Sequence, residues 1–311
     1  MSGPDGAPPA RAATRLVVHA DDVGMNHGAN RAFIELSRFG TITAGSVMVP
    51  CPWFNEIAEA AAADDRLDCG VHLTLNSEMT HYRWGPVTRA SPASGLLDGH
   101  GYLWPDVASV RRHAHPEAVE AEWRAQIDRA LAAGIDVTHL DTHMGSALAP
   151  EWCDRYVALG TAYGIPVLLT SELAAYGPND HLAGAGHGPY REAVAEARAA
   201  GMPVFDEVLE TDFSRHRDRA ADYQAMLGSL DSDLVYCAFH PNAPGGAEIE
   251  AIEPAKFHVR TDEYKLFLTV QWKKWLESRP YTLTGMRELR DAWRASRARS
   301  ELTCGGAPAP G

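Results

Sequence analysis

The chain has 311 residues, of which 45% are hydrophobic and 22% are charged. These proportions are typical of globular proteins and exclude collagenous, coiled-coil and wholly disordered chains. The balance of 28 Lys and Arg against 41 Asp and Glu gives a formal net charge of −13, which disfavours nucleic acid and anionic membrane as partners. The sparse cysteines show no CxxC pattern. The N-terminus shows no pattern of a secretory signal, and no run reaches the ~18 apolar residues of a membrane span. We therefore expect a soluble, cytoplasmic protein with reduced thiols.

Both ends of the chain are rich in Gly, Pro and Ala, which predicts disordered tails over 1–14 and 298–311 and one domain over 15–297. Within the domain, short β-branched runs alternate with segments of helical periodicity. The expected strands are 15–20, 43–49, 68–75, 136–142, 165–169, 234–239 and 281–284. The expected helices are 30–39, 53–63, 116–133, 150–164, 261–277 and 286–294. Residues 76–115 are rich in Gly, Pro and aromatic residues and predict a long functional loop.

This alternation of strands and helices indicates βα units and a mainly parallel sheet. About seven such units fit a single closed or slightly irregular β/α barrel better than an open Rossmann sheet. The segment DVGMNHG after the first strand also lacks the GxGxxG pattern of dinucleotide-binding proteins. The predicted fold class is therefore α/β, a single irregular β/α barrel.

Ionisable residues gather at the ends of four predicted strands. Asp21 and Asp22 follow the first strand, and His72 lies near the end of the third. His143 and His240 follow two later strands. Taken singly, a strand-end histidine is more often a hydrogen-bonded core residue, and the aspartate pair could be a helix cap. Together they indicate a site, because the carboxyl ends of barrel strands form the rim where active sites are built.

These residue types suit metal-dependent hydrolysis. One carboxylate and two imidazoles can hold a divalent ion while leaving positions open for water and substrate, and such an ion activates water and polarises a carbonyl oxygen. A second carboxylate can then act as general base and another histidine as general acid. The ligand types favour Zn²⁺ over Mg²⁺. Asp141 has two interpretations, an orienting partner of a metal-binding histidine or a structural residue, and His19 is expected in the core.

The block HADDVGMNHGANRAF, the strand GVHLTL, the segment THLDTHMG and the late FHP resemble the YdjC-like carbohydrate deacetylases, the family of chitooligosaccharide deacetylase. The resemblance runs from Leu16 to about Arg294. It implies a barrel of the glycoside hydrolase/deacetylase type and hydrolysis of an N-acetyl group from an amino sugar or small glycoside, with release of acetate. It also implies a divalent metal ion, with Mg²⁺ as well as Zn²⁺ represented among relatives, a small carbohydrate partner, and a homodimer as one assembly.

Carried over by position, the resemblance makes Asp22, His72 and His143 the metal ligands. Asp21 then corresponds to the general base, and His240 to a general acid or oxyanion partner. The roles of Asp21 and Asp22 could be exchanged, because adjacent carboxylates cannot be ranked from sequence.

The chain departs from the family in one segment. Many relatives have DSHHHVH there, whereas this chain reads DTHMGSA, with Met144 and Gly145 in place of imidazoles. This departure puts a chitooligosaccharide substrate in doubt. Tyr82, Trp84 and Trp104 in the long loop could stack on a sugar or act as packing anchors. Two other functions stay open, a metal-dependent aldolase or isomerase of barrel type and a catalytically inactive sugar-binding barrel.

Overall fold

The computed structural model describes residues 13–176, 180–182, 184–214, 218–245 and 247–304. Its strands are β1 (Thr14–Val23), β2 (Ala44–Val47), β3 (Cys69–Leu73), β4 (Leu140–Thr142), β5 (Glu207–Glu210), β6 (Leu234–Phe239) and β7 (Tyr281–Leu283). Its α-helices are α1 (His27–Phe39), α2 (Phe54–Ala63), α3 (Val107–His113), α4 (Pro116–Ala132), α5 (Cys153–Tyr163), α6 (Gly188–Ala199), α7 (Arg219–Gly228), α8 (Glu248–Ile252), α9 (Phe257–Phe267), α10 (Val270–Glu277) and α11 (Met286–Cys304). Short 3₁₀ segments occupy η1 (Pro92–Ser94), η2 (His143–Leu148), η3 (Leu173–Ala175) and η4 (Asp180–Leu182).

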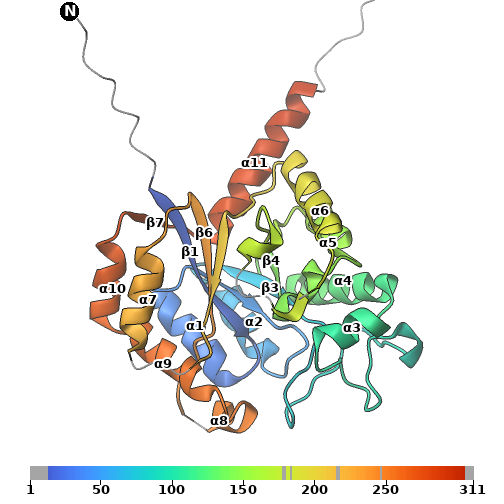
Figure 1. Ribbon diagram of the computed structural model, residues 1–311, viewed down its shortest axis with the longest axis horizontal. Helices are drawn as coiled ribbons and strands as arrows, with labels where there is room; N and C mark the ends of the chain where they lie inside the picture. The colour runs from blue at the N-terminus through green and yellow to red at the C-terminus, as the bar shows by residue number, and fades with distance from the viewer. Residues whose placement is uncertain (1–12, 177–179, 183, 215–217, 246, 305–311) are drawn as a thin grey trace, which may run out of the picture.

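The strands form one parallel sheet in the order β4-β3-β2-β1-β6-β5, with β7 paired to the start of β1. Figure 1 shows β1 and β6 side by side, although about 200 residues separate them in the sequence. Residues 16–20 of β1 and all six residues of β6 are buried. Such continuous burial is typical of parallel strands whose two faces are both covered.

The sheet curls into an irregular barrel whose gap between β4 and β5 is bridged by isolated pairings. Leu140 donates from its backbone N to Pro166 O at 2.9 Å, and Phe205 N donates to Leu169 O at 2.8 Å. The predicted β/α barrel is confirmed. The strand predicted at 165–169 is only a short bridged segment, because Pro166 has no N–H to contribute to a ladder.

Other predicted elements and boundaries also differ from the structure. The helix predicted over 261–277 is divided into α9 and α10, because Thr269 adopts an extended backbone and its hydroxyl caps Trp272 N at 3.1 Å. Residues 170–233, where the sequence predicted no element, contain α6, β5 and α7. Helix α11 continues to Cys304, past the predicted domain end at 297. The predicted tails lie outside the described residues over 1–12 and 305–311.

The core of the barrel is apolar and continuous with the packing of the surrounding helices. Large side chains with almost no exposure include Trp123, Trp152, Tyr156, Phe33 and Phe239. Among the described helices, none has the length and apolar character needed to cross a bilayer. Among the buried polar residues are His19 and Asp22 of β1, His72 of β3 and Asp141 of β4, which lead to the site described next.

Candidate active site and metal centre

The carboxyl ends of β1, β3, β4 and β6 open onto a cavity of about 500 Å³. The five residues predicted to meet at the strand ends all line it: Asp21, Asp22, His72, His143 and His240. Parallel strands deliver their carboxyl ends to the same rim. The structure therefore brings together every residue of the predicted site.

Asp22 occupies a special backbone position at the end of β1. Its φ of 59° lies in the left-handed region, where a non-glycine residue costs on the order of 1 kcal/mol. The register between β1 and β2 also shifts between Ala20 and Val23. The Asp22 side chain at this bend lines the cavity.

The carboxylate of Asp22 faces two imidazoles. Its Oδ1 lies 3.2 Å from His143 Nδ1 and 3.6 Å from His72 Nε2. This oxygen is buried and accepts no hydrogen bond from any described residue, although buried carboxylate oxygens are normally paired. The ligand atoms of the three residues all lie within 4.8 Å of one another. A divalent cation would supply this oxygen with the partner that no hydrogen bond provides, and the donor set of one carboxylate and two imidazoles fits such an ion.

His72 is held by groups behind it. Its Nδ1 lies 2.9 Å from Asp141 Oδ1 and 2.9 Å from Ser46 Oγ, and the Ser46 hydroxyl donates to Asp141 Oδ2 at 2.8 Å. Tyr236 also donates to Asp141 Oδ2 at 3.1 Å. With Nδ1 occupied, Nε2 is the nitrogen left facing Asp22. The contact supports the orienting interpretation of Asp141.

The electrostatics around His143 favour a cation. Burial by itself would lower the pKa of His143, but the nearby carboxylates of Glu78 and Asp22 raise it to about 10. Glu78 Oε2 lies 2.9 Å from His143 Nε2. Burial would likewise raise the pKa of Asp22, yet Arg260 and His143 hold it well below its usual value. Carboxylates that stabilise a proton here also attract a metal ion.

Asp21 and His240 face each other across the same cavity. Asp21 Oδ1 is bound inward, 2.6 Å from His19 Nδ1, while its Oδ2 lies 3.8 Å from His240 Nε2. His240 Nδ1 lies 2.9 Å from the hydroxyl of Thr211, which donates to Glu263 Oε1 at 2.7 Å. His240 Nε2 is therefore the ring nitrogen available to the cavity. Burial lowers the pKa of His240 more strongly than Asp22 and Asp21 raise it.

The sequence of the chain matches a known family over most of its length. The profile of the YdjC-like protein family matches residues 15–278. The chain belongs to the YdjC-like family. It is 35% identical over 162 residues to a carbohydrate deacetylase of Thermus thermophilus, covering 52% of this chain and 56% of that relative. It is 23% identical over 254 residues to a carbohydrate deacetylase of Thermoanaerobacter pseudethanolicus, covering 82% of this chain and 90% of that relative.

A solved structure supports the fold of this YdjC-like protein. A protein of Enterococcus faecalis V583, described as acting in cellobiose-phosphate cleavage, superposes with a TM-score of 0.71 at 20% identity. The superposition covers 89% of this chain and 99% of the other. The predicted family resemblance and barrel architecture are confirmed.

The sequence pattern did not predict several residues that contribute to this site. Arg260 Nη1 in α9 donates to Asp22 Oδ2 at 2.7 Å, and its Nε donates to Glu253 Oε2 at 2.6 Å. Nothing in the sequence connects Arg260 to Asp22, because the two lie 238 positions apart. Glu78 gave a weak signal as the first acidic residue after β3. Glu210 ends β5, a strand that was not predicted.

The aromatic residues of the long loop serve packing. Trp84 donates from Nε1 to Asn76 O at 2.7 Å, and Trp104 donates to Gly95 O at 2.8 Å. Tyr82, Trp84 and Trp104 are absent from the described residues that line the cavity, where the aromatic residues are instead Tyr176 and Phe213.

Met144 and Gly145 do line the cavity, both with positive φ, of 53° and 66°. The position where this chain departs from the family's histidine-rich segment therefore forms part of the cavity wall.

Glu210 gives a pH-dependent expectation. Burial, and then the charge of Asp21, raise its pKa from 4.5 to about 7. The folded state thus holds a proton that the unfolded chain releases at lower pH, so Glu210 lowers the free energy of unfolding as pH rises from about 4.5 through 7. Partial exposure reduces the effect to on the order of 2 kcal/mol. Urea titrations at pH 5 and pH 8 measure the effect. Between these two pH values the free energy of unfolding of the wild type should fall by this amount relative to that of Glu210→Gln. The exposed control Glu250→Gln should not differ from the wild type in this way. Equal pH dependence of wild type and Glu210→Gln would contradict the expectation.

Proposed function

We propose that this YdjC-like protein is a metal-dependent carbohydrate deacetylase. It hydrolyses an N-acetyl group of an amino sugar or small glycoside and releases acetate. The observation that carries the proposal is the buried Oδ1 of Asp22, which accepts no hydrogen bond from a described residue and lies between His72 and His143. It belongs to a cavity whose lining also holds a second carboxylate and a third imidazole. The carbohydrate deacetylase relatives support the same reaction.

Asp22, His72 and His143 are the proposed ligands of a divalent ion. When bound, the ion supplies Lewis-acid activation of water and of the acyl carbonyl. Two nitrogen donors and one oxygen donor favour Zn²⁺, with Mg²⁺ as the alternative. Asp141 holds the His72 ring by its Nδ1, which fixes the nitrogen offered to the ion.

Asp21 is the proposed general base, and the geometry supports this order of the two aspartates. Its Oδ1 is engaged by His19, so Oδ2 is the oxygen free to receive a proton in the cavity. Asp22 is engaged on Oδ2 by Arg260 and keeps Oδ1 toward the two imidazoles. The two neighbours therefore present different oxygens to different partners.

His240 is the proposed general acid for the departing amine. Thr211 holds its Nδ1 and leaves Nε2 toward the cavity. The lowered pKa of His240 makes its protonated form a stronger acid, which suits transfer of a proton to the nitrogen of a breaking amide bond.

Replacing His240 with Gln should separate kcat from binding. We expect kcat to fall by about 10²–10⁴-fold because proton transfer in the transition state is lost, with KM and bound metal little changed. Steady-state kinetics and metal analysis measure these quantities, and the exposed loop residue His100 supplies the control His100→Gln. A rise in KM at constant kcat would show that His240 only binds substrate.

The proposed reaction is tested by release of acetate from a panel of N-acetylated mono- and oligosaccharides. The purified protein is assayed with Zn²⁺, Mg²⁺, Mn²⁺ or Co²⁺ in H₂¹⁸O, and solvent ¹⁸O should appear in acetate. An altered sugar without labelled acetate would favour an aldolase or isomerase. Binding of sugars by calorimetry with no turnover under any metal would favour an inactive sugar-binding barrel.

A further inference from the structure

A row of buried hydrogen bonds crosses the barrel interior from the cavity to the opposite end of the sheet. His19 Nδ1 lies 2.6 Å from Asp21 Oδ1, and His19 Nε2 lies 2.9 Å from His139 Nε2. His139 Nδ1 lies 2.9 Å from Thr138 Oγ1, whose hydroxyl donates to Asp68 Oδ1 at 2.5 Å. Asp68 directly precedes β3, whereas Asp21 lies near the carboxyl end of β1. The row, called here the relay, therefore joins the two ends of the barrel.

The surrounding residues fix both rings of the relay. His19 and His139 have no exposed surface. A Cβ on Gly70 would lie 2.5–2.6 Å from ring atoms of His139, so only glycine leaves room for this imidazole. Tyr236 stacks on His19 with ring centroids 4.7 Å apart. Neither ring is free to turn away from its partners.

The donors along the relay can be assigned in order from Asp68. The Thr138 hydroxyl has one proton and gives it to Asp68, so Thr138 Oγ1 must accept from His139 Nδ1–H. Burial lowers the pKa of His139 to about 3, so this ring is neutral and its Nε2 carries no proton. That nitrogen must accept from His19 Nε2–H. The short contact between His19 Nδ1 and Asp21 Oδ1 then needs a further proton of its own.

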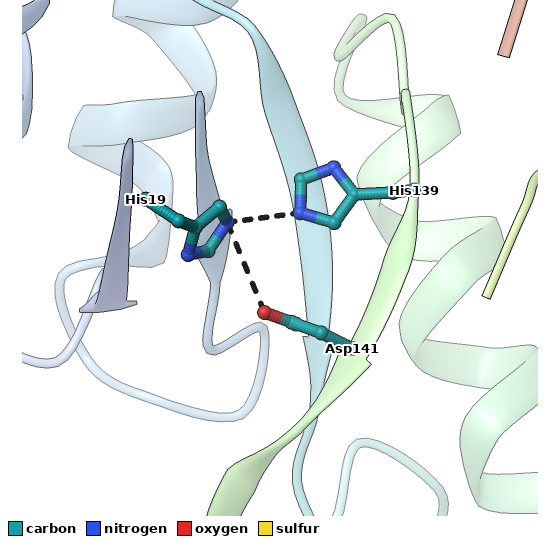
Figure 2. A group of neighbouring side chains, drawn as sticks. All are labelled: His19, His139 and Asp141. Carbon is teal, nitrogen blue, oxygen red and sulfur yellow. Dashed lines mark hydrogen bonds and ion pairs between the residues drawn. The ribbon is translucent and has the colours of Figure 1, made fainter. Parts of the chain in front are cut away.

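Figure 2 shows the three members of this region that lie close enough to hold a metal ion, His19, His139 and Asp141. In that view His19 Nε2 points to His139 Nε2 at 2.9 Å and to Asp141 Oδ2 at 3.8 Å. The second distance is too long for a hydrogen bond. Each ring nitrogen of His19 and His139 already faces a partner at 2.6–2.9 Å. The cluster is therefore explained by proton sharing and needs no ion.

We propose that Asp68 and Thr138 set the tautomer of His139, so that His19 donates from Nε2 to His139 and turns its Nδ1 toward Asp21. His19 is then a positioning residue: its Nδ1 shares a proton with Asp21 Oδ1 and leaves Oδ2 to the cavity. This contact holds the Asp21 carboxyl in the orientation that a general base acting through Oδ2 requires. Only this last step rests on the proposed function, because the tautomers exist without any reaction.

The substitution Asp68→Asn reverses the relay without touching the cavity. The backbone N of Arg287 donates to Asp68 Oδ2 at 2.8 Å, so the side-chain carbonyl of the introduced asparagine must take that place and its NH₂ group must face Thr138. Thr138 then donates to His139 Nδ1, His139 carries its proton on Nε2, and His19 Nε2 becomes the acceptor of that proton. Thr138→Val should shift the tautomers in the same direction by removing the acceptor of His139 Nδ1–H, and Thr138→Ser should preserve the wild-type state.

The experiment is NMR of protein with ¹⁵N-labelled histidine, with signals assigned by their loss in His19→Gln and His139→Gln. The wild type should show His139 protonated on Nδ1 alone and His19 protonated on Nε2. Asp68→Asn should show the reversed pattern, while Asp136→Asn, at the same end of the barrel but outside the relay, should not. A wild-type His139 protonated on Nε2, or tautomers unchanged in both Asp68→Asn and Thr138→Val, would overturn the assignment.

Kinetics then test the positioning role separately. Asp68→Asn should lower kcat about 10- to 100-fold, as for other partners that orient catalytic groups, with KM and bound metal unchanged and with Thr138→Ser at the wild-type rate. Reversed tautomers with an unchanged kcat would overturn the positioning role while leaving the tautomer assignment intact. Absence of acetate release from the wild type itself would overturn the deacetylase proposal, and the NMR result would stand without it.

Discussion

Replacing Asp21 with Asn should leave bound metal in place and remove most deacetylase activity, whereas Asp22→Asn should lose the metal itself. Loss of a general base costs about 10²–10⁴-fold in rate. The amide that Asp21→Asn introduces cannot accept a proton in the cavity, but the three proposed ligands remain. In Asp22→Asn the buried Oδ1 that faces His72 and His143 at 3.6 and 3.2 Å becomes part of a neutral amide and a weaker ligand.

The two variants are matched in size, charge change and position, so comparison of the pair isolates the roles. Metal content of protein purified without chelators and initial rates of acetate release are measured for both. The reverse pattern, with metal lost from Asp21→Asn and retained in Asp22→Asn, would mean that the two aspartates exchange roles. Metal and activity retained in both would mean that the aspartate pair is only structural and that the site lies elsewhere.

Sequence reasoning succeeded where chemistry and topology agree. His72, His143 and His240 each lie at or directly after a strand, and a parallel sheet delivers such positions to one rim whatever the details of packing. The same reasoning failed for Arg260, which reaches Asp22 from the middle of α9. Its placement depends on how a helix packs against the barrel, and no periodicity in the sequence encodes the contact between Arg260 and Asp22.

The relay shows a second limit of the sequence. His19 was correctly expected in the core, but burial alone does not reveal that its two nitrogens join Asp21 to His139. Likewise Asp68 reads as an ordinary strand-start residue, and its link to Thr138 depends on the register of β3 beside the 138–139 segment. Pairing between strands that are distant in sequence determines such contacts, so they become visible only in the folded structure.

The ion pair of Arg260 should have one of the largest effects on stability in the molecule. Arg260 is almost fully buried and binds both Asp22 and Glu253. Arg260→Met keeps most of the side-chain volume but deprives the buried Asp22 carboxylate of its guanidinium partner at Oδ2. Breaking a buried pair from one side typically costs about 3–5 kcal/mol. Arg66→Met is the control, because Arg66 binds Asp64 with 70% of its side chain exposed, and exposed pairs contribute little to stability.

A bound ion should change this cost in a specific way. If Asp22 ligates a divalent cation, the ion supplies positive charge to the same carboxylate, so saturating Zn²⁺ or Mg²⁺ should recover part of the stability lost in Arg260→Met. Urea unfolding of both variants, with chelator and with saturating metal, measures the effect. An equal loss with and without metal would argue against Asp22 as a ligand. A loss no larger than that of Arg66→Met would show that Asp22 does not depend on Arg260 for its charge. If metal restores stability in Arg260→Met but not in Arg66→Met, the Arg260 guanidinium of α9 and the proposed metal ion act on the same carboxylate, that of Asp22.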